Sequence, residues 1–294
     1  MQLVTFRQNG ISEVGILLPA GIFPVKMINT LFQQTFPPEM FLLIQTGGIE
    51  RLRQWYDANG PAVLEKKKKQ CLSPREVRLT RLYPHPGKIW GIGLNYRTHA
   101  DELDETVPTS APASFMRPDT TIVDYGGEIR IPVDSEKTTA EGELGIIIGK
   151  QCKDVDPDRW LEVVAGFTTI TDVTAEDILR RNPRYLTLSK SFDTFFSFGP
   201  SLLTPDEIPD VEALEVSTVL NGDVRARDTV SNMMFSPREL VAFHSRVMTL
   251  QAGDVISTGT PGAVTIRDGD TVECRIGGFV PLMNRVRDLK IEHG

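Results

Sequence analysis

The sequence predicts a β-rich α+β fold in which a small N-terminal domain, residues 1–78, precedes a larger domain, residues 79–294. Residues 61–87 carry a run of four lysines and several prolines, which is the composition of a connector. Beyond the connector, apolar runs of strand length recur between turn signals, whereas only two segments carry the start signals of a helix. This change of pattern places the domain boundary near residue 78.

The N-terminal segment shows strand-like runs at residues 4–6 and 14–18, followed by helical patterns at 41–44 and 49–55. Strands and helices in so short a segment predict a small α+β domain. The basic run at residues 66–69 is short, and such runs are more typical of a solvated helix end or a linker than of a polyanion site.

The larger domain is predicted to be a succession of strands separated by turns. Asn221-Gly222 lies between two alternating segments and predicts a two-residue hairpin, because both turn positions need a positive φ. Asp268-Gly269 is a second, weaker signal of this kind. The expected strands occupy residues 88–94, 141–148, 165–171, 213–220, 224–229, 254–257 and 271–276.

Two helices of the larger domain are marked by their first residues. Residues 174–177, Thr-Ala-Glu-Asp, resemble a capping arrangement, and Ser236-Pro237 places proline at the first position of the other helix. We expect Gly253 to close this second helix. Its apolar face is formed by Leu240, Val241, Phe243, Val247 and Leu250.

Composition restricts the classes of function. The net charge of -7 and the pI near 5.3 argue against a nucleic-acid partner, because phosphates require a basic face. The three cysteines are odd in number and show no paired spacing, which indicates a reducing compartment. The first residues lack the pattern of a signal peptide, and no apolar stretch reaches about 18 residues. We therefore expect a cytoplasmic protein with no membrane partner.

Three carboxylates form the strongest candidate site. Glu141 and Glu143 are two apart in an expected strand, so their side chains point the same way, and Asp172 ends a second apolar stretch. Carboxylate oxygens without a Cys or His pattern favour Mg²⁺, Mn²⁺ or Ca²⁺ over Zn²⁺ or copper. On spacing alone, a solvated strand that carries two acids is the more common explanation.

Two further groups could act beside these carboxylates. Residues 91–102 follow a strand and are polar, as expected of a loop over a site. His99 and Glu102 are three apart, so in a helix the carboxylate could orient the imidazole, although such a pair is usually a surface contact. Lys190 lies among apolar and small residues and could stabilise developing negative charge, or it could be a surface lysine.

Several of these segments together resemble the fumarylacetoacetate hydrolase superfamily, which includes acylpyruvate hydrolases and oxaloacetate decarboxylases. The resemblance spans residues 88 to about 290 and implies a mixed β-roll for the larger, catalytic domain, together with a homodimer. It also makes a metal site the better explanation of the carboxylates. The matching segments are residues 92–99, 141–150, 166–168 with 172–175, 190–194 and 253–261.

The resemblance implies a role for each matched residue. Glu141, Glu143 and Asp172 match the metal ligands, His99 and Glu102 match a dyad that activates water, and Lys190 matches an oxyanion-stabilising lysine. Thr260 matches a substrate-contacting threonine, and Asn95 and Arg97 of the first segment are expected to contact substrate as well. The implied cofactor is Mg²⁺ or Mn²⁺, with Ca²⁺ as an alternative, and the implied ligand is a small 2-oxo or 1,3-dioxo acid.

The sequence departs from the family pattern at three positions. Glu176 and Leu179 stand where the family usually has Arg and Gln, and an acid in place of an arginine would repel a substrate carboxylate. Arg117 stands where the family commonly has Lys, which keeps the charge but alters the geometry. A nearby arginine could substitute for the missing one: Arg180, Arg181 or Arg184.

Three classes of function remain open at this stage. The leading one is a metal-dependent hydrolase that cleaves a C–C bond of an acylpyruvate-like acid with a water activated by His99 and Glu102. The second is a lyase that decarboxylates or dehydrates a 2-oxo acid on the same metal. The third, disfavoured by the presence of His99, Glu102 and Lys190, is a non-catalytic metabolite-binding relative.

Overall fold

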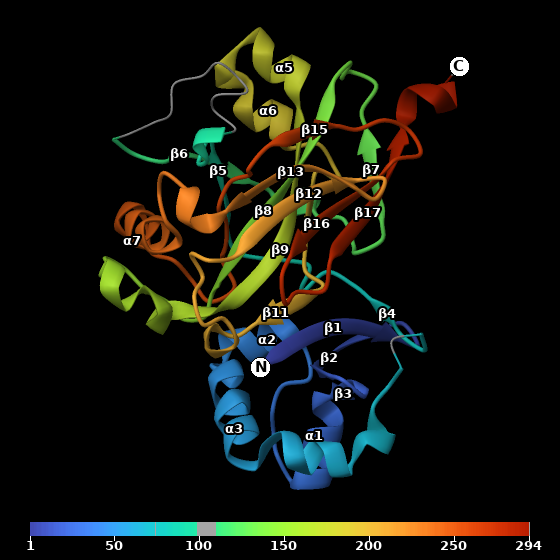
Figure 1. Cartoon of the computed structure of the whole chain (residues 1–294), viewed down its shortest axis with the longest axis vertical. Helices are drawn as coiled ribbons and strands as arrows, with labels where there is room; N and C mark the ends of the chain where they lie inside the picture. The colour runs from blue at the N-terminus through green and yellow to red at the C-terminus, as the bar shows by residue number, and fades with distance from the viewer. Residues whose placement is uncertain (74, 99–109, 294) are drawn as a thin grey trace.

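The computed structural model describes residues 1–73, 75–98 and 110–293. With its longest axis vertical, the N-terminal strands and helices form one end of the molecule, and α5 and α6 form the other (Figure 1). The strands form two mixed β-sheets, and the larger sheet includes the N-terminal strands. Within the described residues, no helix combines the length and the hydropathy that a membrane span requires.

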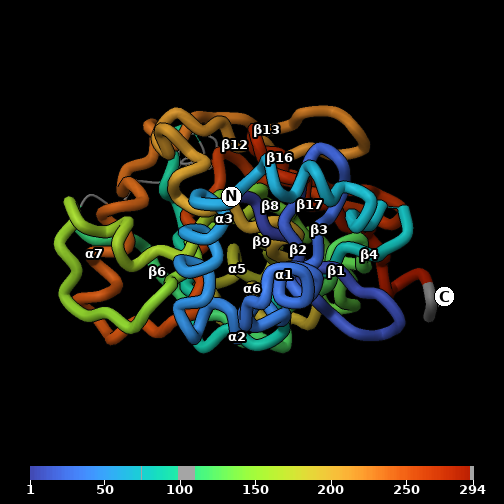
Figure 2. Tube along the Cα trace, turned by 90° about the horizontal axis from the view of Figure 1, so that it is seen from below, coloured from blue at the N-terminus to red at the C-terminus, as the bar shows by residue number. Residues whose placement is uncertain are grey.

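The N-terminal end is an antiparallel β-meander with helices packed beside it. The strands are β1 (Gln2–Gln8), β2 (Ile11–Leu18) and β3 (Gly21–Pro24), and their apolar side chains pack with those of the helices in one core cluster. From below, the helices lie in front of these strands (Figure 2). They are α1 (Val25–Phe32), α2 (Met40–Gln45), α3 (Gly48–Lys66) and the 3₁₀ turn η1 (Lys68–Gln70).

The connector predicted from residue 61 onward begins later than expected. Helix α3 continues to Lys66 through a break at Gly60, whose φ of 28° and ψ of -151° are not helical. Pro61 follows this break, and proline suits the first turn of a helix because it has no N–H to leave unpaired. The lysine run therefore begins at the end of a helix, as its charge pattern indicated.

Within the residues that the structure describes, the larger sheet has twelve strands, and it continues from the N-terminal strands into the larger domain. β1 pairs with β11, with Leu3 opposite Leu202, so the N-terminal strands extend the sheet that contains β8 and β9. The domain boundary near residue 78 therefore remains a prediction. Further strands of this sheet are β4 (Arg78–Leu79), β5 (Ile89–Gly93), β6 (Ala113–Arg117), β8 (Thr138–Ile148), β9 (Val164–Ala175), β10 (Phe196–Phe198), β11 (Ser201–Leu203), β14 (Val255–Ser257) and β15 (Ala263–Thr265).

The second sheet has five strands and includes the predicted hairpin. Asn221 and Gly222 join β12 to β13 with φ values of 53° and 89°, so the hairpin is confirmed. The hairpin expected at Asp268-Gly269 is wrong, because the turn connects β15 of the first sheet to β16 of the second. The strand order is β13 (Asp223–Thr229), β12 (Glu215–Leu220), β16 (Thr271–Ile276), β17 (Leu282–Asp288) and β7 (Glu128–Ile131).

The β-rich α+β fold class is confirmed, with parallel and antiparallel pairs in both sheets. Every residue of β8 and β9 is buried, which makes this pair the centre of the molecule. The apolar side chains of the two strands pack with those of the second sheet. One core cluster contains Leu144, Ile146, Phe167, Val216, Cys274 and Ile276.

The two predicted helix starts differ in outcome. Helix α7 (Pro237–Val247) begins as expected, and the Ser236 N–H donates to the Glu239 carboxylate at 2.8 Å. It ends well before Gly253, which lies in the loop ahead of β14. The capping role expected of Thr174 is wrong, because Thr174 belongs to β9 and α5 (Glu176–Arg181) has Ala175 as its N-cap. The remaining helical segments are α6 (Leu186–Lys190), η2 (Asp119–Thr121), η3 (Pro157–Val163), η4 (Pro183–Tyr185), η5 (Pro205–Glu207), η6 (Val230–Asn232) and η7 (Leu289–His293).

Candidate metal centre

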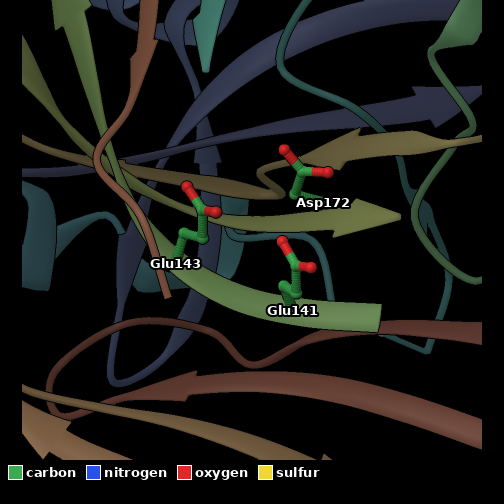
Figure 3. Close-up of side chains that lie close together, drawn as sticks. All are labelled: Glu141, Glu143 and Asp172. Atoms are coloured by element: carbon green, nitrogen blue, oxygen red, sulfur yellow. The ribbon is translucent and has the colours of Figure 1, made fainter. Parts of the chain in front are cut away.

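The three predicted carboxylates meet at the centre of the larger sheet. Glu141 and Glu143 project from β8, and Asp172 lies directly opposite Glu141 on β9. One ligand oxygen from each side chain lies within 4.8 Å of the others, and the residues are 8%, 1% and 1% exposed. Figure 3 shows the three carboxylates turned toward one another. Strand alternation and register therefore produce the cluster that the sequence predicted.

In the described part of the chain, Lys190 is one of two cations in contact with this cluster. Its Nζ donates to Glu141 Oε2 at 2.9 Å and to Asp172 Oδ1 at 2.8 Å. The ammonium also lies 5.2 Å from the centroid of the Phe115 ring. Burial lowers the pKa of Lys190, but Asp172 and Glu141 outweigh it, and the net pKa is raised. The lysine is therefore a buried ammonium group, not a solvated surface side chain.

Glu143 is held from the other side by the glycine-rich turn after β14. Its Oε2 accepts hydrogen bonds from Ser257 Oγ and, at 2.8 Å, from the Gly259 N–H. Burial, followed by the charges of Asp172 and Glu141, raises the pKa of Glu143 to about 8. The shift has two physical causes: burial disfavours the charged form, and two further carboxylates share the space.

Arg117, at the end of β6, supplies the second cation. Its guanidinium donates to Asp172 Oδ1 through Nη2 and to the carbonyl oxygens of Lys190 and Phe195 through Nη1. The sequence identified this arginine as a departure from a family pattern but did not place it in the site. Arg117 and Asp172 are 55 residues apart in the sequence, and no local pattern predicts a contact over that separation.

The residues fit a divalent cation. Both oxygens of Glu141 accept hydrogen bonds, Oε1 from Thr174 Oγ1 at 3.1 Å and Oε2 from Lys190. Glu143 and Asp172 each accept through one oxygen, and among the described residues their second oxygens accept no hydrogen bond. When all three carboxylates are ionised, they exceed the two cations by one negative charge in a buried space. Hard oxygen ligands with surplus negative charge are what Mg²⁺ and Mn²⁺ prefer.

The three expected substrate contacts lie in different surroundings. The Asn95 amide makes three hydrogen bonds to backbone groups of Phe235 and Thr258. Arg97 is exposed, and its Nε lies 3.2 Å from Met234 Sδ. Thr260 Oγ1 donates to the carbonyl of Gly142, between the two glutamates, at 3.1 Å. Thr260 therefore lies next to the cluster, whereas Asn95 joins two loops by hydrogen bonds. The substrate roles of all three residues remain predictions.

Glu176, which stands where the family usually has Arg, lies at the start of α5 and forms ion pairs there. Glu176 pairs with Lys137 at 2.8 Å and with Arg180 at 2.6 Å. Burial raises its pKa, but the hydrogen bonds from Lys137 and Arg180 more than offset this, so the pKa is lowered. Arg181 pairs with Asp177 at 3.1 Å. Two of the arginines considered as substitutes are thus engaged on their own helix, whereas Arg184 is exposed.

His99 and Glu102 lie outside the described residues. Their role as a water-activating dyad remains a prediction from the sequence.

The mixed sheets and the buried acidic centre define a class of β-rich proteins suited to hold a divalent cation. Comparisons with known proteins narrow this class. The family model "Fumarylacetoacetate (FAA) hydrolase C-terminal" matches residues 88–287. The chain therefore belongs to the fumarylacetoacetate hydrolase superfamily, as its motifs indicated.

Relatives within this superfamily carry several activities in their names. A mitochondrial oxaloacetate tautomerase of Rattus norvegicus is 31% identical over 97% of this chain and 91% of its own length. The structure of 5-carboxymethyl-2-hydroxymuconate delta-isomerase from Mycobacterium smegmatis has a TM-score of 0.67 and 36% identity, covering 74% of this chain and 82% of that one. Maleylpyruvate hydrolase from Sphingobium sp. SYK-6, in complex with manganese(II) and pyruvate, has a TM-score of 0.77 and 26% identity, covering 98% and 99%.

Proposed function

We propose that this protein is a Mg²⁺- or Mn²⁺-dependent hydrolase that cleaves a C–C bond of a 2-oxo or 1,3-dioxo acid resembling an acylpyruvate. The observation that carries the proposal is a buried ammonium group, Lys190, bonded to two carboxylates of a three-carboxylate centre. A bound cation and a positive charge beside it would both stabilise an enolate as its charge develops. The manganese and pyruvate bound to the maleylpyruvate hydrolase relative support the same chemistry.

A divalent ion between the carboxylates would supply Lewis acidity toward the neighbouring carbonyl and carboxylate oxygens of the substrate. His99, oriented by Glu102, takes a proton from the water that attacks the distal carbonyl carbon. The C–C bond then breaks, and its electron pair passes to the pyruvate-like fragment as an enolate. The ammonium of Lys190 stabilises the charge that develops on this fragment. His99 returns the proton it took to the enolate, which completes the reaction and restores the base.

The charge balance of the centre favours an anionic substrate. The protein groups keep one surplus negative charge, so a bound divalent ion makes the centre positive by one. A 2-oxo acid carries one carboxylate beside its carbonyl and would neutralise that charge on binding. We also expect the protein to act as a homodimer in the cytoplasm, which sedimentation and fractionation would test.

A second candidate is a lyase or tautomerase acting on a 2-oxo acid at the same centre. The rat oxaloacetate tautomerase, which is similar over nearly the whole chain, favours this alternative. Such reactions need the same enolate stabilisation by Lys190 but no attacking water. Decarboxylation therefore does not require His99 as a base for water, whereas tautomerisation still requires a base, so the products of the reaction distinguish the two candidates.

A substrate panel with Mn²⁺ tests the proposal directly. Acylpyruvates, oxaloacetate and sugar-derived 2-oxo acids would be incubated with the protein, and products would be identified by mass spectrometry and by keto–enol absorbance. We expect an acylpyruvate to yield pyruvate and a carboxylic acid. Decarboxylation or tautomerisation without hydrolysis would favour the second candidate, and no reaction across the panel would favour a binding protein.

The variant His99→Ala should lower the rate of C–C hydrolysis by about 10²–10⁴-fold, the usual contribution of a positioned base. Calorimetric Mn²⁺ binding should persist in this variant, so a lost activity would report chemistry and not a lost ion. His85→Ala, at an exposed histidine that contacts Asp119, is the matched control. Hydrolysis at the parental rate without His99 would refute the proposed base.

A further inference from the structure

Arg117 makes more contacts with the candidate metal centre than its place on an outer strand suggests. Its side chain is fully buried, although β6 is the last strand on its side of the larger sheet. Nη1 donates to the carbonyl oxygens of Lys190 and Phe195, the latter at 3.1 Å. Nη2 donates to Asp172 Oδ1 and to the Val173 carbonyl at 3.3 Å. One guanidinium thus joins three separate segments around the cluster.

The guanidinium is also confined by aromatic rings. Its central carbon lies 5.6 Å from the Phe115 ring centroid and 5.5 Å from that of Phe196. Three backbone carbonyls fix the plane of the fork, so the direction of the bond to Asp172 is fixed as well. An ammonium group on a flexible stem has no planar fork and could not hold all of these acceptors at once.

We infer that Arg117 is a positioning residue of the metal centre: it holds Asp172 by one oxygen so that the other faces the ion, and it fixes Lys190 through its carbonyl. This inference rests on the metal centre of the proposed function. It adds a residue that touches neither the ion nor the substrate and acts only through Asp172 and Lys190.

A purely electrostatic role of Arg117 and a positioning role predict opposite changes in Mn²⁺ affinity when Arg117 is removed. If Arg117 acted only through its positive charge, its removal would strengthen Mn²⁺ binding, because one repulsive cation would be gone. A lysine at this position would then bind Mn²⁺ as the parent does. If Arg117 positions Asp172, both replacements weaken binding, since residues that orient metal ligands typically contribute about 10–100-fold in affinity.

The experiment measures Mn²⁺ affinity by calorimetry in the parent, Arg117→Lys and Arg117→Met. The electron paramagnetic resonance spectrum of the bound ion reports its ligand geometry, and the thermal midpoint without metal reports the fold. Arg81→Lys is the matched control, because Arg81 also bonds a carboxylate, Asp124, at 2.6 Å and a carbonyl, Ile122, at 3.2 Å. If Arg117→Met does not fold, Arg117→Lys alone decides the question.

We expect about 10–100-fold weaker Mn²⁺ binding and a changed spectrum in Arg117→Lys, with Arg81→Lys binding as the parent does. Parental affinity and spectrum in Arg117→Lys, with or without a lower thermal midpoint, would overturn the inference while leaving the metal centre intact. Tighter binding in Arg117→Met would overturn it in favour of a purely electrostatic role. A parent protein that binds no Mn²⁺ would overturn the metal centre itself and the inference with it.

Discussion

The surplus of negative charge at Glu141, Glu143 and Asp172 should have a measurable energetic cost at the level of single residues. Glu143 is 1% exposed, and the charge of Lys190 and the hydrogen bonds from Ser257 and Gly259 do not offset its burial beside two other carboxylates, so its pKa is raised. Crowded buried carboxylates disfavour the folded state when no further cation is present. The crowded carboxylates lower the stability of the metal-free protein, but the same negative charges attract a divalent cation.

Glu143→Gln should therefore stabilise the metal-free protein, by about 0.5–2 kcal/mol. Glutamine keeps an oxygen that accepts from Ser257 and Gly259 but removes the charge. The same variant should lose the stabilisation by Mn²⁺, which at a free concentration of 100 times Kd amounts to about 2.7 kcal/mol in the parent. Thermal unfolding with EDTA and with Mn²⁺ measures both effects.

The matched control for this prediction is Glu273→Gln. Glu273 lies on a strand of the second sheet and pairs with Arg275 at 2.9 Å, away from the cluster. Its variant should retain the full Mn²⁺ effect. A full Mn²⁺ effect in Glu143→Gln would exclude Glu143 as a ligand, and a lower stability in EDTA would contradict the crowding argument.

Among the elements, the β8–β9 pair positions the site, and the turns set the strands around it. The register places Glu141 opposite Asp172, and a shift of one residue would turn all of β9 to its other face. On the second sheet, the β12–β13 hairpin closes over two residues in the left-handed region. The turn residues there are set by backbone conformation, since a Cβ at Gly222 would meet no atom within 4 Å.

Gly222→Ala should therefore destabilise the protein by about 1–2 kcal/mol, because an L side chain is strained at its φ of 89°. Gly277→Ala is the control: it also has open space around its Cβ, but its φ lies outside the left-handed region. That variant should stay within about 0.5 kcal/mol of the parent. Urea unfolding compares the two, and equal losses would show that turn conformation is not the cause.

At the scale of the whole molecule, the larger sheet and several ion pairs connect the N-terminal end and the connector to the rest. β1 lies between β2 and β11, so its backbone hydrogen bonds serve both halves of the larger sheet. Thr80 and Arg81, just after β4, both donate to Asp124 Oδ1, at 2.9 and 2.6 Å. These contacts join the connector to the segment that precedes β7.

The Asp124 link should make stability depend on pH. Burial raises the pKa of Asp124, but hydrogen bonds from Thr80 and Arg81 and the charge of Arg81 more than offset it, so the pKa is lowered. A carboxyl whose folded pKa is depressed stabilises the protein above its unfolded pKa of about 3.9, and this stabilisation is lost as pH falls through the folded value. Asp124→Asn should therefore be less stable than the parent at pH 7.

The difference between Asp124→Asn and the parent should shrink as the pH is lowered below about 4, where the parent also carries a neutral carboxyl. Thermal midpoints between pH 3 and pH 7 would show this convergence. Asp193→Asn, at an exposed carboxylate for which the described residues provide no hydrogen bond, is the control and should follow the parent throughout. A constant gap across the range would rule out ionisation as the source.

Local patterns were enough to predict much of the fold. The Asn221-Gly222 hairpin, the start of α7 and the central strands β8 and β9 follow from turn chemistry, capping and apolar runs. Short strands such as β10 and β11 were not predicted, because three residues carry too little periodicity. The turn at Asp268-Gly269 was placed correctly but joins different sheets, and no local signal distinguishes the two cases.

The sequence by itself determined which residues could form an acidic centre, because Glu141, Glu143 and Asp172 lie on strands whose alternation is local. Only the tertiary structure decided which groups compensate the negative charge of that centre. Arg117 reaches Asp172 from 55 residues away, and Ser257 reaches Glu143 from 114 residues away. Such contacts depend on the order and register of strands in the sheet. The physical reason is that periodicity encodes the face of an element, whereas long-range packing decides which faces meet.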